Sequence, residues 1–214
     1  MSDRKRVALI FGGQSSEHGI SCLTASSVLK AIDKDRFEVI GVGITKNGTW
    51  EQVPLEVIEN YAIVDGVAPE VEEAPHEAVW MVGENGCEVA TREGETLVDI
   101  HGVDVAFALL HGPYGEDGTI QGLFEMMGIR YVGSGVTASA IGMDKHFMKV
   151  AFEAAGLPVY PYVAASALRL EQDRDAVLAE INKLTYPLFV KPARGGSSIG
   201  ISRVSDPSDQ EAAN

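Results

Sequence analysis

Near its start the chain has an unbroken apolar run, followed by a segment in which apolar residues recur at helical spacing. Together they predict a strand followed at once by a helix. Residues 7–11 are all apolar and end at Gly12 and Gly13, which is typical of a buried parallel strand that runs into a tight turn. Ser15 and Ser16 are favourable helix N-caps. An apolar stripe follows at Ile20, Leu23, Val28, Leu29 and Ile32. We therefore expect a helix over about residues 16–32.

Two more apolar runs, at residues 37–44 and 104–110, continue a strand-helix-strand pattern that predicts a doubly wound parallel sheet. Between them, residues 51–75 are acidic and contain three prolines. Residues 79–98 alternate around glycines like an antiparallel ribbon. We interpret this stretch as an insertion and not as a separate domain.

The second half of the chain has a different pattern. A helix over 118–127, a short strand over 130–132 and a helix over 144–155 that ends at Gly156 lead into it. Strands are then expected over 159–164, 188–191 and 200–204, with a polar-faced helix over 173–183. This α+β pattern allows antiparallel pairing. Residues 206–214 have the pattern of a further helix start.

Composition narrows the classes of function. The chain has 214 residues, 45% of them hydrophobic, and a net charge of −14, which disfavours nucleic acid and anionic membranes as partners. The apolar run after the charged N-terminus is too short for a secretory or membrane segment. We expect Cys22 to be a buried thiol and Cys87 a loop thiol, both in a reducing cytoplasm.

A lysine followed by a glycine-rich stretch is the first candidate for chemistry. Lys191 ends a predicted strand, and the stretch to Gly200 contains Gly195, Gly196, Ser197 and Ser198. Glycines let backbone N–H groups approach phosphate oxygens, and lysine supplies a compact charge. A hairpin turn with a surface lysine is equally compatible with these residues alone.

Two more candidates follow predicted parallel strands, whose carboxyl ends are where such sheets bind ligands. His111 begins the stretch His-Gly-Pro-Tyr-Gly-Glu-Asp-Gly, and Glu17 ends the stretch Gly-Gly-Gln-Ser-Ser-Glu. Glu17 is placed to bind an ammonium group. The alternative is that Glu17, Glu116 and Asp117 only cap helices and that His111 is a satisfied polar residue.

Two weaker patterns lie between residues 133 and 145. Residues 133–138 match a G-x-G-x-x-A dinucleotide pattern, but no acidic residue about 20 positions later lies at the end of a second predicted strand. Lys145 follows Asp144 at a predicted helix start. It offers a second lysine, although such pairs are usually exposed.

Together these motifs resemble the ATP-grasp superfamily and, within it, the D-alanine:D-alanine ligases. The matching motifs are G-G-x-S-x-E-x-x-[IV]-S at 12–21, H-G-x-x-G-E-D-G-x-x-Q-G at 111–122, G-S-G-V-x-x-S at 133–139, M-D-K at 143–145 and K-P-x-x-x-G-S-S-x-G at 191–200. The resemblance implies a pre-ATP-grasp α/β domain over 1–138, with the ribbon at about 79–98, and an incomplete ATP-grasp central domain over 139–214.

The resemblance also implies a reaction. One D-alanine carboxylate takes the γ-phosphoryl group of ATP, and the amine of a second D-alanine attacks the resulting acylphosphate, in the synthesis of peptidoglycan precursors for the cell wall and cell shape. Alternatives are a ligase that joins D-alanine to D-lactate or D-serine, or a non-catalytic nucleotide-binding module. Members of the family are commonly dimers, which implies a homodimer here.

Residue roles are carried over by motif. Glu17 would hold the ammonium of the first D-alanine, with His111 beside it. Lys145 and Lys191 would contact ATP phosphates, and Gly196, Ser197 and Ser198 would form the closing loop, with Ser197 also facing the amino acid. Gly195 stands where the family commonly has an acidic residue. The Mg²⁺ or Mn²⁺ ligands are expected beyond residue 214, so no metal ligand is assigned within this chain.

Overall fold

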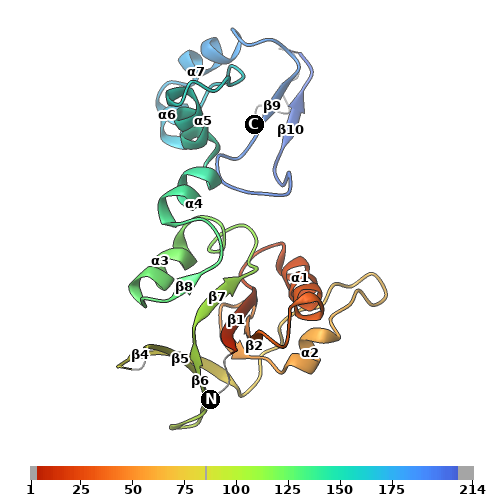
Figure 1. The fold of residues 1–214 in the computed structure, drawn as a ribbon. Helices are drawn as coiled ribbons and strands as arrows, with labels where there is room; N and C mark the ends of the chain where they lie inside the picture. Colours follow the sequence, from red (N-terminus) through yellow and green to blue (C-terminus); the bar gives the residue numbers. More distant parts are fainter. Residues whose placement is uncertain (1–3, 85, 207–214) are drawn as a thin grey trace. The chain divides into compact units, whose positions relative to one another are not determined.

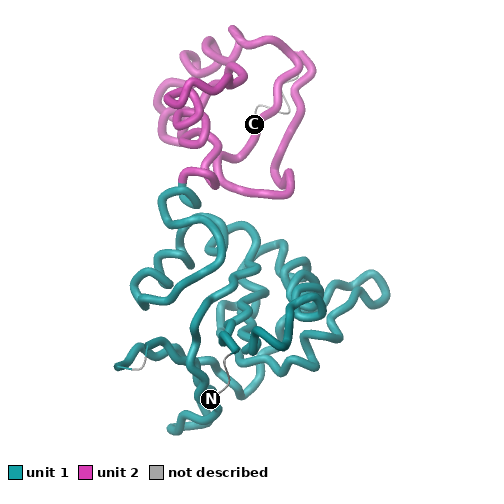
Figure 2. The backbone as a smooth tube through the Cα atoms, viewed as in Figure 1, with its two compact units in different colours: residues 1–140 teal, residues 141–214 magenta. Residues whose placement is uncertain are grey.

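The computed structural model describes residues 4–84 and 86–206, and it divides the chain into two compact units, residues 1–140 and 141–214 (Figure 2). Each unit is described by itself. The prediction for residues 206–214 lies almost wholly outside the described residues. No helix of the described chain is both long and apolar enough to cross a membrane.

Unit 1 is built on one eight-stranded sheet with the order β6-β5-β4-β3-β2-β1-β7-β8. Its strands are β1 (Lys5–Gly12), β2 (Phe37–Ile44), β3 (Trp50–Gln52), β4 (Glu77–Gly83), β5 (Gly86–Glu93), β6 (Thr96–Val103), β7 (Val105–Ala108) and β8 (Arg130–Tyr131). Its helices are α1 (His18–Ala31), α2 (Leu55–Glu59) and α3 (Thr119–Met126). The helix α4 (Val136–Met143) crosses the division between the units.

The sheet is parallel in one half and antiparallel in the other. Strand β1 pairs in parallel with β2 and β7, and β7 pairs in parallel with β8. Strands β3 to β6 continue the same sheet in antiparallel fashion. The predicted ribbon therefore has three strands, spans 77–103 and joins the main sheet through the short β3.

Side chains that alternate along β1 form two cores, one on each face of the sheet. Leu9 and Phe11 pack with residues of α1 and α2, whereas Ala8 and Ile10 pack with Phe124 of α3. Figure 1 shows α1 and α2 beside the central strands, with α3 on the other side. The unbroken apolar run of β1 is explained by burial on both faces.

Unit 2 combines helices α5 (Lys145–Ala154), α6 (Ala167–Gln172) and α7 (Arg174–Ile181) with the antiparallel strands β9 (Leu188–Val190) and β10 (Ser202–Val204). Helix α5 begins after the N-cap Asp144 as predicted, but α4 and α6 were not predicted. The strand predicted at 159–164 is wrong, because no strand forms there in the described residues. Pro161 lies inside this stretch and has no N–H to donate to a ladder.

Both cysteines are buried, so the prediction of Cys87 as a loop thiol is wrong. Cys87 lies on β5, inside the core of one sheet face. Burial raises the pKa of the Cys22 thiol to about 12, and burial also raises the pKa of Cys87. A protonated, enclosed thiol is a poor nucleophile.

The buried Glu51 predicts a specific pH dependence of stability. Glu51 on β3 is 2% exposed, and its Oε2 atom has no hydrogen-bond partner among the described residues. Burial raises the pKa of this carboxyl, although backbone N–H groups of Ala74 and His76 partly oppose the shift. A carboxyl with a raised folded-state pKa adds stability below its ordinary pKa and loses it as the pH rises through the raised value.

We therefore expect the free energy of unfolding of the natural chain, relative to that of Glu51→Gln, to fall as the pH rises from 4 toward 7. Urea unfolding followed by the fluorescence of Trp50 and Trp80 measures this difference. Glu95→Gln is the matched control, since Glu95 is exposed in the turn between β5 and β6. If the free energies of unfolding of Glu51→Gln and of the natural chain change with pH in parallel, the expectation is contradicted.

Candidate functional site

The carboxyl ends of β1 and β7 bring two of the predicted motifs to the same edge of the sheet. The strands are parallel neighbours, with Ile10 opposite Ala108. The Gly12–Gly13 turn and His111 follow these two strands, so both motifs emerge side by side. This is the edge at which open α/β sheets bind ligands.

Glu17 and the His111 motif meet at Gly112. A Cβ built on Gly112 would lie 3.2 Å from Ser15 Oγ and 3.7 Å from Glu17 Oε2, and the φ of Gly112 is +72°. Helix α1 starts at His18, two residues later than predicted, and Glu17 takes the N-cap position without a side-chain capping bond. The Glu17 N–H instead donates to Ser15 Oγ at 3.1 Å. The carboxylate of Glu17 therefore lies against the His111 motif.

His111 is one of the residues that line a cavity of about 210 Å³ at this edge. The cavity is lined by both glycines of the turn and by Gln14, Trp50, Leu110, Tyr114 and Thr119, among others. Nε2 of His111 is buried and has no hydrogen-bond partner within the described part of the chain. A buried ring nitrogen without a partner beside a cavity is a group available to a ligand.

The two acids of the His111 motif shape its loop, which favours the structural interpretation of them. Glu116 Oε2 accepts the Gly112 N–H at 2.7 Å, and Asp117 accepts N–H bonds from Tyr114 and Thr119 at 2.9 and 3.0 Å. Burial opposes ionisation of Asp117, but these bonds outweigh it and lower the pKa. Gly118 begins α3 with a φ of +93°.

In unit 2, the predicted phosphate loop directly follows β9. Lys191 lies one residue past the end of that strand and is exposed. Ser197 and Ser198 both have positive φ values, 49° and 59°, and Gly195 and Gly200 also have positive φ. Positive φ values let the backbone turn sharply here, and a turn that presents successive N–H groups can bind an anion.

The start of α5 is fastened to this loop. The Lys145 N–H donates to Ala193 O at 2.9 Å, and Lys145 Nζ donates to Gly195 O at 2.8 Å. Arg194 Nε lies 3.1 Å from Asp144 Oδ2. Burial raises the pKa of Asp144, but Arg194 and the N–H groups of the first helical turn outweigh it, so the pKa is below its ordinary value. Lys145 is therefore held at the loop and is not the free surface residue of the alternative interpretation.

Lys149 is a residue of this loop region that sequence reasoning missed. It lies four residues after Lys145, so both occupy the same face of α5. Its ammonium lies 4.2 Å from the centroid of the Tyr162 ring. Burial, and then the charge of Lys191, lower the pKa of Lys149. The i, i+4 spacing of the two lysines was the available signal.

The predicted site residues thus form two groups. Glu17 and His111 come together in unit 1. Unit 2 holds Lys145, Lys191 and the loop residues Gly196, Ser197 and Ser198. All the residues of one group belong to the same unit.

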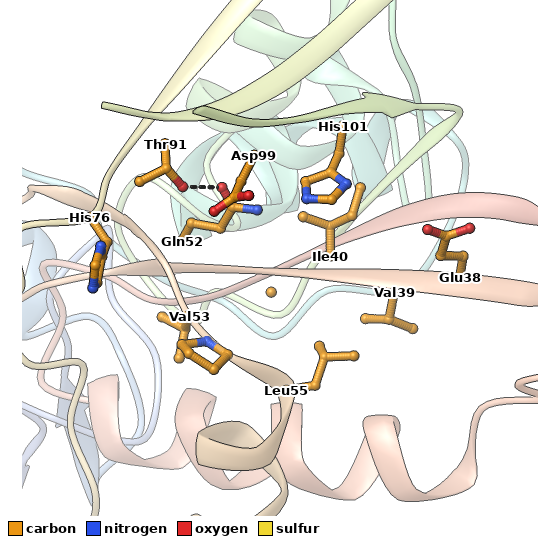
Figure 3. Close-up of a pocket in the computed structure, with 12 residues that line it drawn as sticks. Glu38, Val39, Ile40, Gln52, Val53, Leu55, His76, Thr91, Asp99 and His101 are labelled. Atoms are coloured by element: carbon orange, nitrogen blue, oxygen red, sulfur yellow. Dashed lines mark hydrogen bonds between the residues drawn. The ribbon is translucent and has the colours of Figure 1, made fainter. Parts of the chain in front are cut away.

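A larger cavity of about 320 Å³ lies elsewhere in unit 1 (Figure 3). It is lined by the first half of β2 and by ribbon residues, including Asp99 and His101, and Thr91 donates to Gln52 across one wall. None of the predicted site residues lines it, and it lies away from the carboxyl ends of β1 and β7. We therefore place the candidate site at the smaller cavity.

No group of three or more metal-ligating side chains forms within residues 4–84 and 86–206.

Comparison with known proteins agrees with the fold and the motif geometry. Residues 6–134 match the D-ala D-ala ligase N-terminus, and residues 151–213 match the D-ala D-ala ligase C-terminus. A D-alanine–D-alanine ligase of Paenarthrobacter aurescens is 49% identical over 216 residues, 100% of this chain and 56% of that protein. One of Pseudarthrobacter chlorophenolicus is 50% identical over 204 residues, 94% of this chain and 53% of that protein.

Solved structures give the same result. The VanG D-Ala:D-Ser ligase of Enterococcus faecalis superposes with a TM-score of 0.77 at 34% identity, over 98% of this chain and 58% of that one. The D-alanine-D-alanine ligase of Coxiella burnetii, at 24% identity and a TM-score of 0.78, shows the shared fold over 99% of this chain and 57% of that one.

The fold, shared with these structures, places the chain in the ATP-grasp class of proteins. Within it, the chain belongs to the D-alanine–D-alanine ligase family, whose N-terminal signature covers more than half of its residues. It spans about half the length of the curated relatives it matches.

Proposed function

We propose that this chain contributes to an ATP-dependent ligase that joins two D-alanines through an acylphosphate. The observation that carries the proposal is the match of both family signatures, in order, to residues 6–134 and 151–213. The geometry supports it, because a carboxylate lies at the carboxyl edge of the sheet in unit 1 and lysines lie beside a glycine-rich loop in unit 2.

Each group of residues has a role in this proposal. Glu17 holds the ammonium of the first D-alanine, and His111 Nε2 donates to or accepts from a polar atom of that substrate. Lys145 and Lys191 neutralise the ATP phosphates, and N–H groups of the loop at Gly196, Ser197 and Ser198 surround the transferred phosphoryl group. Phosphoryl transfer depends on such positioning and charge neutralisation more than on covalent catalysis.

The family also suggests the domain organisation, location and metal requirement of the enzyme. We assign residues 1–138 as the substrate-side domain and 139–214 as part of the ATP-grasp central domain. The product would serve peptidoglycan synthesis in the cytoplasm, in a homodimer that uses Mg²⁺ or Mn²⁺ bound by residues outside this chain. These assignments are based on what is expected of the D-alanine–D-alanine ligase family.

ADP release tests the activity. In a polypeptide of the relatives' full length that carries this chain, we expect ADP release from ATP only when D-alanine is present. A coupled assay with D-alanine, L-alanine or no amino acid measures it. Equal turnover in the three conditions would refute the proposal.

The VanG structure, named as a D-Ala:D-Ser ligase and 34% identical, supports one second candidate, a ligase that joins D-alanine to D-serine. Product analysis with equal concentrations of D-alanine and D-serine distinguishes the two. A predominance of D-alanyl-D-alanine supports the first proposal, and a predominance of the mixed dipeptide supports the second.

A further inference from the structure

His18 is a histidine enclosed between three segments of unit 1. It is the first residue of α1 and is 1% exposed. Nδ1 lies 2.8 Å from Gly13 O, and Nε2 lies 2.9 Å from the backbone nitrogen of Val71. Because the Val71 N–H can only donate, Nε2 must accept, so the proton is on Nδ1 and donates to the Gly13 carbonyl. Both ring nitrogens are thus used, each with a defined direction.

One partner of this ring belongs to a covering segment, which we define as residues 68–74. Glu70 pairs with Lys46, and Glu73 accepts a bond from Asn47 Nδ2 at 2.7 Å. A Cβ added to Gly19 would lie 2.5 Å from the Cβ of Ala68. The covering segment is therefore packed directly against the first turn of α1.

The other partner is the turn that leads to Glu17. The Gly12 N–H donates to Ser21 Oγ, and the Gly13 N–H donates to Ile44 O, both at 2.8 Å. These bonds fix the amide groups of the turn. His18 adds the bond that fixes the Gly13 carbonyl, four residues before the Glu17 carboxylate.

We infer that His18 is a positioning residue for the substrate site, an inference that rests on the proposed function. Its ring ties the covering segment to the Gly12–Gly13 turn and so sets the direction in which Glu17 enters α1 and meets Gly112. His18 itself touches no substrate. The bond to Gly13 is the one that orients Glu17, and the bond to Val71 holds the ring in place.

Two amide variants separate these bonds. His18→Asn keeps an N–H donor near the position of Nδ1 and loses the acceptor for Val71. His18→Gln places an acceptor near the position of Nε2 and loses the donor to Gly13. His18→Leu fills much of the space and makes neither bond. His76→Leu is the control, because His76 is an exposed histidine of the same unit.

The variants are compared in a polypeptide of the relatives' full length, with the KM for D-alanine at the first site, the KM for ATP and kcat measured separately. We expect His18→Leu and His18→Gln to raise the KM for D-alanine about tenfold, equivalent to about 1.4 kcal/mol. The KM for ATP should change less than about twofold, well below that tenfold step. His18→Asn should recover most of the loss, and His76→Leu should match the natural protein.

Amide hydrogen exchange of the 214-residue chain gives a second measurement that does not depend on turnover. His18→Asn should lose protection at Val71 while keeping it at Gly13 and Ser21, which also shows that unit 1 is folded.

The outcomes separate the inference from the proposed function. Two results would show that His18 is only a packing residue and would overturn the inference. One is an equal KM for D-alanine in His18→Asn and His18→Gln. The other is a change of kcat, the KM for D-alanine and the KM for ATP by the same factor. An unchanged KM for D-alanine in His18→Leu would overturn it as well. If the natural protein releases ADP without D-alanine, the proposed function fails first, and the substrate role of His18 fails with it.

Discussion

Gly12→Ala is expected to destabilise unit 1 by about 3 kcal/mol or more, the sum of a left-handed backbone penalty and overpacking. Gly12 has a φ of +87°, and a Cβ there would lie 2.3 Å from the backbone oxygen of Ile44 and 2.9 Å from the side chain of Val71. A backbone oxygen in a paired strand cannot move away cheaply. The urea midpoint followed by tryptophan fluorescence should fall by about 1 M or more.

Gly122→Ala is the matched control for this substitution. Gly122 lies inside α3, and a Cβ there would meet nothing within 4 Å. Alanine should stabilise that helix by up to about 1 kcal/mol. If the two variants shift the urea midpoint in the same direction and by similar amounts, the close approach at Gly12 is not what makes an added Cβ destabilising.

Lys191→Met is expected to lower kcat/KM for ATP by about 100-fold or more, the size of effect seen when a charge-stabilising donor is removed. Lys191 follows β9 at the entry to the glycine-rich loop. It lies near Lys149, and the pKa of Lys149 is lowered first by burial and second by the charge of Lys191. Methionine keeps most of the length of the side chain and removes the charge. Steady-state ADP release in a polypeptide of the relatives' full length measures the effect.

Two comparisons sharpen the Lys191 prediction. Lys191→Arg keeps the charge but changes its shape, so it should recover part of the activity. Lys183→Met removes an exposed lysine just after α7 and should leave the activity unchanged. If Lys191→Met and Lys183→Met behave alike, Lys191 has no special role at the phosphates.

Local patterns predicted most elements of the fold because local forces decide them. The apolar run of β1, the bounds of β2 and the start of α5 near residue 144 follow from burial and helix-boundary rules that act within a few residues. The two failures have different causes, one local and one tertiary. Residues 159–164 have strand-like composition, but Pro161 lacks a donor. The burial of Cys87 depends on β5 pairing with both β4 and β6, which lies beyond local pattern.

The candidate site divides in the same way. The sequence motifs predicted that Glu17 and His111 would each follow a parallel strand, and the pairing of β1 with β7 places the two strand ends at one edge. Their roles, and those of Lys145, Lys191 and Ser197, stay predictions. The buried partners of His18 were not predictable from sequence, because Val71 lies 53 positions away and belongs to a stretch without regular structure.

The enclosure of both native thiols makes this chain a convenient background for site-specific labelling. Cys22 and Cys87 are buried, and each has a raised pKa, so maleimides should react with them slowly while the chain is folded. Ser197, by contrast, is exposed on the glycine-rich loop. A single Ser197→Cys substitution would therefore accept a fluorophore without removal of either native cysteine. The emission of that probe would report on the environment of the loop as nucleotide is added.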